Sequence, residues 1–267
     1  MNKVVKKIIT KSDLIENFKK LGLERGSIVE LHVALSKFDY IVGGTQTLID
    51  ALIDVVTYEG TIVMAMHTNN NTDPSVWRYP PVEYNLMDDI RTCMPAFDKK
   101  NSDARNMGAV LDGFRRRDGI VHSMHPVYSY VAWGKYAKLI CNHQSLNFPL
   151  AEESGTARLY ELKAKCLLLG VDFDNATCLH LSEYRSGVRP IIVEGCKMIS
   201  DNIDVFKKFL NLDLNSNDFI KGMIGFKNHY ELFEAKIGDL NCKCFNINEG
   251  IDYLVSFFDK KMEGYYY

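Results

Sequence analysis

The spacing of apolar residues in the first quarter of the chain alternates between two periods, and it predicts helices and strands in turn. A helix, a strand, a second helix and a second strand are expected at residues 9–23, 26–35, 42–60 and 60–68. The first helix has two possible caps, Thr10 with Asp13 or Ser12 itself. The strand–helix–strand order predicts a parallel strand pair joined by a crossover helix.

Residues 69–107 interrupt this pattern. They are rich in Asn, Pro and Asp and show little periodicity. A stretch this long inside a compact domain is typically a lid or a binding loop. We therefore expect a long substrate loop at about 69–107.

Regular elements resume beyond the loop. Helices are expected at 107–117, 156–164 and 250–267, and strands at 128–134, 165–171, 191–199 and 243–247. The apolar run CLLLGV (166–171) is typical of a central parallel strand that is buried on both faces. Since no repeat or linker is visible, we expect one α/β domain that spans 1–267.

Composition narrows the class of protein. The chain of 267 residues is 46% hydrophobic and has a net charge of -2, so it has no basic excess for nucleic acid. No apolar run is long enough to span a membrane, and the first residues do not resemble a secretory signal. The seven scattered Cys lack the spacing of a zinc site and fit a reducing compartment. We expect a cytoplasmic protein that binds no metal, membrane or nucleic acid; the sequence does not predict its oligomeric state.

His180 and Glu183 are the first candidates for catalysis. They follow the run 166–171, and ligands bind beyond the carboxyl ends of strands in open α/β sheets. On a helix, positions three apart share a face, so Glu183 can orient His180 as a general base. Asp172, at the end of the strand, can serve in place of Glu183. The spacing alone equally fits a solvent-exposed His–Glu pair.

Two neighbouring segments near the N-terminus are candidates for phosphate binding. Backbone N–H groups of VGGTQT (42–47) precede a helix, although the segment matches no known phosphate-loop pattern. Ser36 and Lys37 flank the end of the preceding strand and can bind a pyrophosphate. A plain helix cap and a solvated lysine are the alternatives.

Two further clusters of polar and aromatic residues stay open at this point. HSMHPVYS (122–129) holds two histidines, but Pro126 disfavours a helix and no further metal ligand is near. The long loop carries residues that can line a polar substrate pocket or pack onto the domain: Asp73, Trp77, Arg78, Tyr79 and Tyr84.

Taken in order, motifs along nearly the whole chain resemble the aminoglycoside 3-N-acetyltransferase family. They are LHVALSKFDYIVGGTQTLIDAL, GTIVMAMHT, DPSVWRYPPV, MPAFD, RNMGAVLDGFR, HSMHPVYSYVAWGKYA, GTARLYEL, CLLLGV, TCLHLSE and NDFIKGMIGF. The sequence departs from the family pattern at His122, where Arg is usual, and at Ala65 and Met66, where Pro-Thr is usual.

The resemblance implies an α/β/α sandwich on a central, mostly parallel sheet, with acetyl-CoA as donor and a primary amine as acceptor. It implies that His180 removes a proton from the acceptor amine, directly or through a water, that Glu183 orients His180, and that Thr177 helps to position the thioester. It also places coenzyme A near nine residues: His32, Ser36, Lys37, Gly43, Gly44, Thr45, Ser123, His125 and Ser129.

The acceptor is argued from charge. Aminoglycosides carry several ammonium groups, so their pocket should be rich in carboxylates. The loop instead mixes both signs, with Asp73, Glu83, Asp88 and Asp89 against Arg78, Arg91, Lys99 and Lys100. We therefore expect a nucleotide-linked amino sugar for surface polysaccharide, with an aminoglycoside as the alternative acceptor. A thioester hydrolase or a non-catalytic protein that binds coenzyme A is the second alternative.

Overall fold

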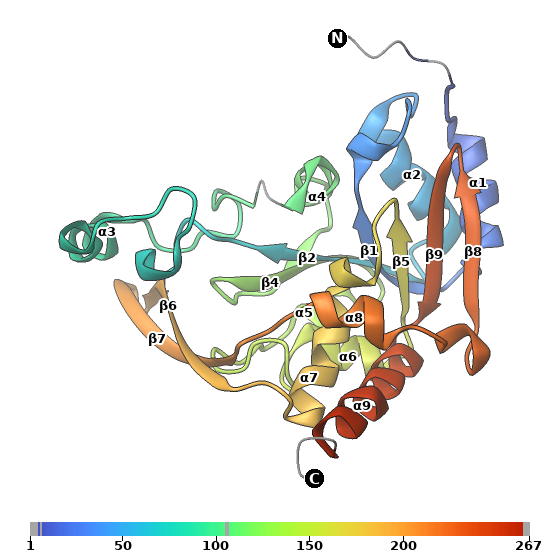
Figure 1. The fold of residues 1–267 in the computed structure, drawn as a ribbon. Coiled ribbons are helices and arrows are strands. Elements are labelled where there is room, and N and C mark those ends of the chain that lie inside the picture. The colour runs from blue at the N-terminus through green and yellow to red at the C-terminus, as the bar shows by residue number, and fades with distance from the viewer. Residues whose placement is uncertain (1–4, 6, 105–106, 264–267) are drawn as a thin grey trace.

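The computed structural model describes residue 5 and residues 7–104 and 107–263, and Arg105 and Asn106 of the RNMG motif lie outside them. Its main feature is a seven-stranded sheet with the order β3-β4-β2-β1-β5-β9-β8 (Figure 1). The strands are β1 (Ile28–Val33), β2 (Thr61–His67), β3 (Val121–His122), β4 (Tyr128–Gly134), β5 (Lys165–Leu169), β8 (Leu232–Ile237) and β9 (Leu240–Asn246). β1 is parallel to β2 and β5, whereas the flanking strands pair antiparallel.

The parallel centre of the sheet follows from the predicted strand–helix–strand order. Helix α2 (Gly44–Val56) crosses from β1 to β2 and buries its apolar stripe against the sheet. Along β1, Val29 and Leu31 face one hydrophobic core, while the alternate residues Glu30 and His32 face the other side. Thr10 forms the predicted capping box with Asp13 at the start of α1 (Lys11–Lys20).

Helices cover both faces of the sheet and make a three-layered α/β/α sandwich, which confirms the predicted fold class (Figure 1). One core lies beneath α1, α2 and α4 (Ala109–Phe114). The other lies beneath α5 (Ala137–Cys141), α6 (Gly155–Glu161) and α9 (Ile247–Glu263). Two shorter helices, α7 (Leu181–Ser186) and α8 (Asn217–Gly222), also pack against α9.

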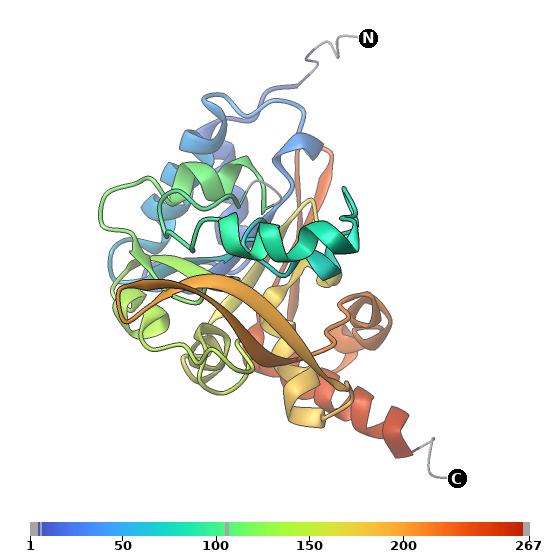
Figure 2. The same ribbon diagram turned by 90° about the vertical axis from the view of Figure 1, so that its left-hand side faces the viewer.

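A two-stranded ribbon stands apart from the sheet. Strands β6 (Ile191–Ser200) and β7 (Ile203–Leu212) pair only with each other among the named strands. The loop at 69–107 lies along this ribbon and carries helix α3 (Met87–Cys93) (Figure 2). Backbone hydrogen bonds tie the two together, from Asp73 N–H to Gly195 O (2.9 Å) and from Lys197 N–H to Asn71 O (2.8 Å). Within the described ranges, no helix has the length and apolar character needed to cross a bilayer.

Candidate active site

The predicted catalytic residue His180 ends a short 3-10 helix that begins at Thr177, which we call the catalytic turn. A 3-10 helix, Thr177–His180, runs directly into α7. Residues three apart eclipse one another in a 3-10 helix, so Thr177 lies on the same side of it as His180. The ring of Phe219, on α8, packs edge-on against the imidazole with 5.0 Å between centroids. The predicted catalytic residues are thus held together by local helical geometry.

His180 and Glu183 form the predicted pair. His180 Nδ1 lies 2.5 Å from Glu183 Oε2, and the carboxylate side chain is fully buried. A carboxylate only accepts hydrogen bonds, so the proton of the neutral imidazole is fixed on Nδ1. The lone pair is therefore on Nε2, the nitrogen that can take a proton from an acceptor.

Arg189 compensates the buried charge of Glu183. Its Nε donates to Glu183 Oε1 at 2.5 Å, and the backbone N–H of Asn215 donates to the same oxygen at 3.1 Å. Its other end donates to Asp218 at 2.7 Å. Burial alone would raise the pKa of Glu183, but the bonds from His180 and Arg189 outweigh it and lower the pKa. Glu183 is thus held as a carboxylate, the form that His180 requires.

This lowered pKa predicts how stability depends on pH. The bonds of ionised Glu183 stabilise the fold above the group's ordinary pKa of 4.5, and that contribution is lost as pH falls through the lowered pKa of the folded state. Urea unfolding between pH 7 and pH 3 should therefore show that Glu183→Gln loses stability relative to wild type at neutral pH, and that the gap narrows below pH 4.5. Exposed Asp89→Asn is the control. A gap that is independent of pH would contradict this account.

A second buried carboxylate lies beneath the turn. Glu30 Oε2 accepts the backbone N–H of Cys178 at 3.2 Å and lies 3.1 Å from His32 Nε2. The N–H of Thr177 approaches the same His32 nitrogen at 3.4 Å. Ligand atoms of Glu30, His32 and Cys166 lie within 4.8 Å of one another, a spacing that can hold a metal ion. His32 and one oxygen of Glu30 are, however, already engaged by the backbone of the turn.

A cavity of about 880 Å³ opens between the ribbon and the start of the loop at 69–107. We call it the acceptor cavity, after the role that we propose for it below. Its charged lining residues are three carboxylates and one guanidinium: Asp73, Asp103, Glu194 and Arg78. Glu194 accepts from Tyr128 Oη at 2.9 Å, and burial raises the pKa of its carboxyl group.

His67 links the acceptor cavity to the catalytic turn. It ends β2, lines the cavity and lies close enough to His180 for their charges to interact. Burial and the neighbouring histidines lower the pKa of His67 to about 3, so it is neutral at physiological pH. Its Nε2 is buried and has no hydrogen-bond partner among the described residues. His180 itself does not line the cavity.

Asp172, the alternative to Glu183 as the partner of His180, binds Lys243 instead. Asp172 pairs with Lys243 Nζ at 2.7 Å and accepts the backbone N–H of Phe173 at 2.8 Å. Asp172 is therefore not the orienting carboxylate, because Glu183 occupies His180 Nδ1. Its place at the strand end does not bring it to the imidazole, since the chain turns away through a short helix at Phe173–Asn175.

The expectation that Ser123, His125 and Ser129 contact coenzyme A is not supported. All three are buried, and their polar atoms bind the protein itself. Ser123 Oγ donates to Gln144, His125 Nδ1 accepts two backbone N–H groups, and Ser129 Oγ donates to Met66 O. They fasten β4 to neighbouring segments instead.

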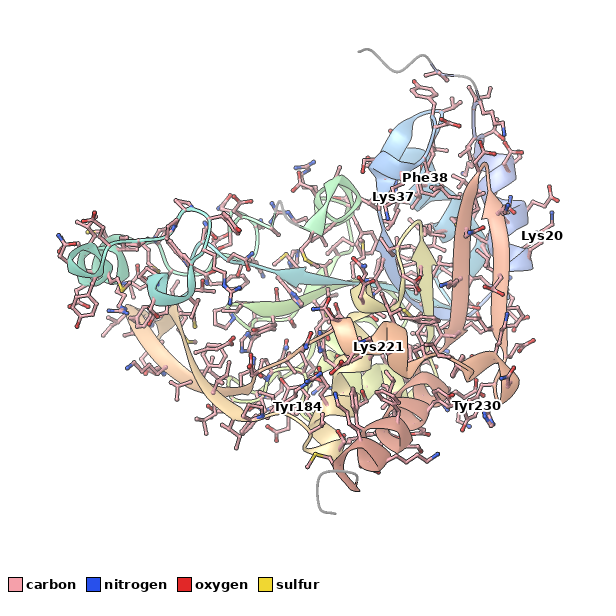
Figure 3. All side chains as sticks on the ribbon, viewed as in Figure 1. Lys20, Lys37, Phe38, Tyr184, Lys221 and Tyr230 are labelled. Atoms are coloured by element: carbon pink, nitrogen blue, oxygen red, sulfur yellow. The ribbon has the colours of Figure 1, made fainter. Side chains whose placement is uncertain are left out.

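The other residues predicted for coenzyme A, apart from buried His32, cluster at the start of α2. Ser36 and Lys37 are exposed on the segment between β1 and α2, where Figure 3 labels Lys37. Gly43 caps α2 in the left-handed conformation (φ 80°), and a Cβ there would lie 2.3 Å from Thr47 Oγ1. No side chain caps this end, but the N–H of Gly44 is bound to Ile41 O at 2.9 Å, so an anion would bind the N–H groups that follow it. Gly44 and Thr45 follow in the first turn.

The substrate-binding residues predicted from the loop divide into two groups. Asp73, Trp77, Arg78 and Tyr79 line the acceptor cavity. Tyr84 does not line it and is 89% exposed, because it lies in the separate helical turn Tyr84–Leu86. Four residues of the cavity or of the hydrogen-bonded chain at His180 were not predicted. A single His, Arg or acidic residue outside a motif gives no indication of function in the sequence. They are His67, Asp103, Arg189 and Glu194.

Comparisons with known proteins agree on one family. The family model described as aminoglycoside 3-N-acetyltransferase matches residues 31–259. The SPbeta prophage-derived aminoglycoside N(3')-acetyltransferase-like protein YokD of Bacillus subtilis (strain 168) is 38% identical over 93% of this chain and 92% of its own. The crystal structure of YokD superposes with a TM-score of 0.93 over 97% of this chain and 96% of that one, at 36% identity. Aminoglycoside N(3)-acetyltransferase IX of Micromonospora chalcea is 30% identical over 87% of this chain and 82% of its own.

These matches overturn the expected acceptor. The prediction of a nucleotide-linked amino sugar for surface polysaccharide was wrong, since the matching family and its relatives are named as aminoglycoside acetyltransferases. The charge count misled because it drew on the whole loop, of whose eight counted charges only Asp73 and Arg78 line the cavity. Arg91 is bound to Asp73 and Asp88, and Lys99 and Lys100 lie outside the lining.

Proposed function

The chain belongs to the aminoglycoside 3-N-acetyltransferase family, and from this premise we propose that it transfers the acetyl group of acetyl-CoA to an amino group of an aminoglycoside. The buried His180–Glu183–Arg189 chain of hydrogen bonds is the observation that carries the proposal. It fixes the tautomer of the imidazole with the lone pair on Nε2, and His67, whose charge interacts with that of His180, lines a cavity that also holds carboxylates. We further propose that residues 1–267 act as a single acetyltransferase domain.

The proposed reaction needs proton removal more than activation of a nucleophile. An aminoglycoside ammonium becomes nucleophilic once it loses a proton to His180 Nε2, directly or through a water. The neutral amine nitrogen then bonds to the acetyl carbonyl carbon and gives up a second proton as the bond from that carbon to sulfur breaks. One of the two protons leaves on the thiol of coenzyme A, and the other passes to solvent. Glu183 stabilises the imidazolium that forms, and Arg189 keeps Glu183 ionised. We assign to Thr177, on the same side of the turn, the role of positioning the thioester.

We propose that the open end of α2 binds the phosphates of coenzyme A. Its uncapped N–H groups and exposed Lys37 suit an anionic group. Acetyl-CoA supplies the acyl group as a co-substrate. The acceptor cavity supports the assignment of the acceptor, because Asp103 and Glu194 outnumber Arg78 in its lining even when Asp73, which pairs with Arg91, is left out of the count.

The first test measures free thiol released from acetyl-CoA. Gentamicin and kanamycin are compared with glucosamine, which has a single amine, and with a reaction that contains no amine. We expect turnover that depends on the aminoglycoside. Thioester consumption without an amine would instead indicate a hydrolase, and no consumption with any amine would indicate a binding protein.

Glu194 gives a second test, directed at the acceptor cavity. Glu194→Gln should raise the KM for gentamicin about 10- to 150-fold, because a hydrogen bond to a charged group contributes about 1.5–3 kcal/mol. The KM for acetyl-CoA should not change. Glu234→Gln, an exposed position on β8, is the matched control. An unchanged KM for gentamicin would remove Glu194 from the acceptor site.

A further inference from the structure

The start of the catalytic turn is capped by side chains from a distant strand. Ala176, at the N-cap of the 3-10 helix, makes no capping hydrogen bond with its own side chain. The first two N–H groups of the helix point instead to β1. Cys178 N donates to Glu30 Oε2 (3.2 Å), whereas Thr177 N lies 3.4 Å from His32 Nε2, a nitrogen that can accept it only when it does not donate to Glu30 Oε2, 3.1 Å away. A carboxylate at a helix N-terminus is also favoured by the helix dipole.

Glu30 is costly to keep in the core. Its side chain is fully buried, and Oε1 has no hydrogen-bond partner among the described residues. Leaving a buried acceptor unsatisfied costs about 1–3 kcal/mol, and more when the group is charged. An apolar side chain of similar size would fill the same space without this cost. A group retained at such cost calls for an explanation other than packing.

We propose that Glu30, together with His32, positions the catalytic turn, so that β1 sets the place of His180 relative to the sheet. The proposal rests on the proposed function for its kinetic consequence, but its geometry is independent of the substrate. Glu30 touches no reacting atom in this scheme. It acts through the backbone of Cys178, two residues before His180.

The turn is thereby held from both ends by buried carboxylates. Glu30 fixes the N–H of Cys178, and Glu183, held by Arg189, fixes the imidazole three residues before it. A shift of the turn by about 1 Å would misalign His180 Nε2 with the acceptor amine, and such misplacement can lower the rate by about 100-fold. Removal of the Glu30 carboxylate should therefore lower kcat and leave the KM values of both substrates unchanged.

Three variants separate positioning from packing. Glu30→Leu removes the acceptor and keeps the volume, and we expect kcat to fall about 10- to 100-fold while the unfolding midpoint stays close to that of wild type. Glu30→Gln keeps a carbonyl oxygen for the Cys178 N–H, and we expect it to retain kcat within about threefold. Val29→Ala is the matched control on the opposite face of β1, and it should lower stability but keep kcat.

The kcat and folding of these variants decide whether Glu30 positions the turn or only packs in the core. Equal kcat in Glu30→Leu and wild type, or equal losses in Glu30→Gln and Glu30→Leu, would overturn the positioning role. If Glu30→Leu does not fold, Glu30→Ala takes its place with the same expectation. Failure of both to fold would show that Glu30 is required for folding and would equally overturn the proposal.

A spectroscopic readout tests the proposal without any substrate. The Nδ1 proton of His180, bonded to Glu183, can be followed by proton NMR in protein with labelled histidine. We expect its signal to shift or broaden in Glu30→Leu and to stay unchanged in Val29→Ala. If the wild-type protein acetylates no aminoglycoside, the proposed function fails. The NMR comparison still tests whether Glu30 positions the turn that carries His180. An unchanged signal in Glu30→Leu would show that the turn does not depend on Glu30.

Discussion

Replacing His180 with Asn should lower kcat for aminoglycoside acetylation by about 10²- to 10⁴-fold, the range expected for loss of a general base. Asn can keep a hydrogen bond to Glu183 but has no nitrogen that takes up a proton near neutral pH. The loss should be smaller at high pH, where more of the acceptor amine is already neutral. Steady-state rates from pH 6 to pH 9.5, measured by thiol release, give both quantities.

Two controls make the His180 result specific. His143→Asn carries the same substitution at an exposed site and should keep the wild-type rate. Binding of coenzyme A, measured by calorimetry, should survive in His180→Asn, since the proposed phosphate site lies at the start of α2. A His180→Asn enzyme with a rate near that of wild type would exclude His180 as the base.

Replacing Arg189 with Met should produce the largest loss of stability, about 3–5 kcal/mol, because it leaves Glu183 buried without its compensating charge. Activity should fall as well, since a protonated Glu183 no longer favours the imidazolium that forms at His180. The free energy of unfolding from urea titration and kcat from thiol release measure the two effects. Arg189 also packs over the ring of Phe258 at 5.8 Å, and Met preserves much of that apolar contact.

The matched control for Arg189 is Arg185, four residues earlier. Arg185 pairs with Glu152, whose side chain is 62% exposed, so Arg185→Met should cost about 1 kcal/mol or less. The double variant Glu183→Gln/Arg189→Met should regain part of the stability and none of the activity. Equal stability losses in Arg185→Met and Arg189→Met would show that burial of Glu183 does not set the cost.

The sequence predicted the centre of the fold because periodicity there is strong. β1, α2 and β2 fall within one to four residues of their expected bounds, and their apolar residues form the core. β7 and β8 were not predicted, since their residues are largely exposed or half-buried and their patterns are mixed. The ribbon also pairs with the loop at 69–107, through a bridge between Thr72 and Cys196, and one sequence does not show such a contact.

The site was predictable where its contacts are local. His180 and Glu183 are three residues apart on one helical turn, so spacing alone brought them together. Arg189 returns to Glu183 only because Gly187 adopts a left-handed conformation (φ 65°) that ends α7, and spacing does not encode that return. Contacts across the sheet, such as that from Glu30 to Cys178, depend on strand order, which one sequence does not show.

The coenzyme A site predicted at 122–129 stays a prediction, and the structure shows that its Ser and His side chains bind other parts of the protein. Clustered Ser and His residues suggest a binding surface, yet buried backbone groups also need hydrogen-bond partners. His125 accepts the N–H groups of Val127 and Tyr128, and its pKa falls to about 4 as burial disfavours the charged form. Whether such residues serve a ligand or the fold is decided by burial, which the sequence does not give.

The ribbon of β6 and β7 separates two tasks within one chain. It supplies Glu194 and Phe209 to the acceptor cavity, yet its strands share no hydrogen-bonded register with the seven-stranded sheet. The catalytic turn, by contrast, is fastened to that sheet through β1. The separation is not complete, because Tyr184 of α7 donates to Asn211 of β7, which in turn donates to Glu194. For the proposed enzyme, we therefore expect substitutions at ribbon positions other than Asn211 to change the range of acceptors more than the turnover rate.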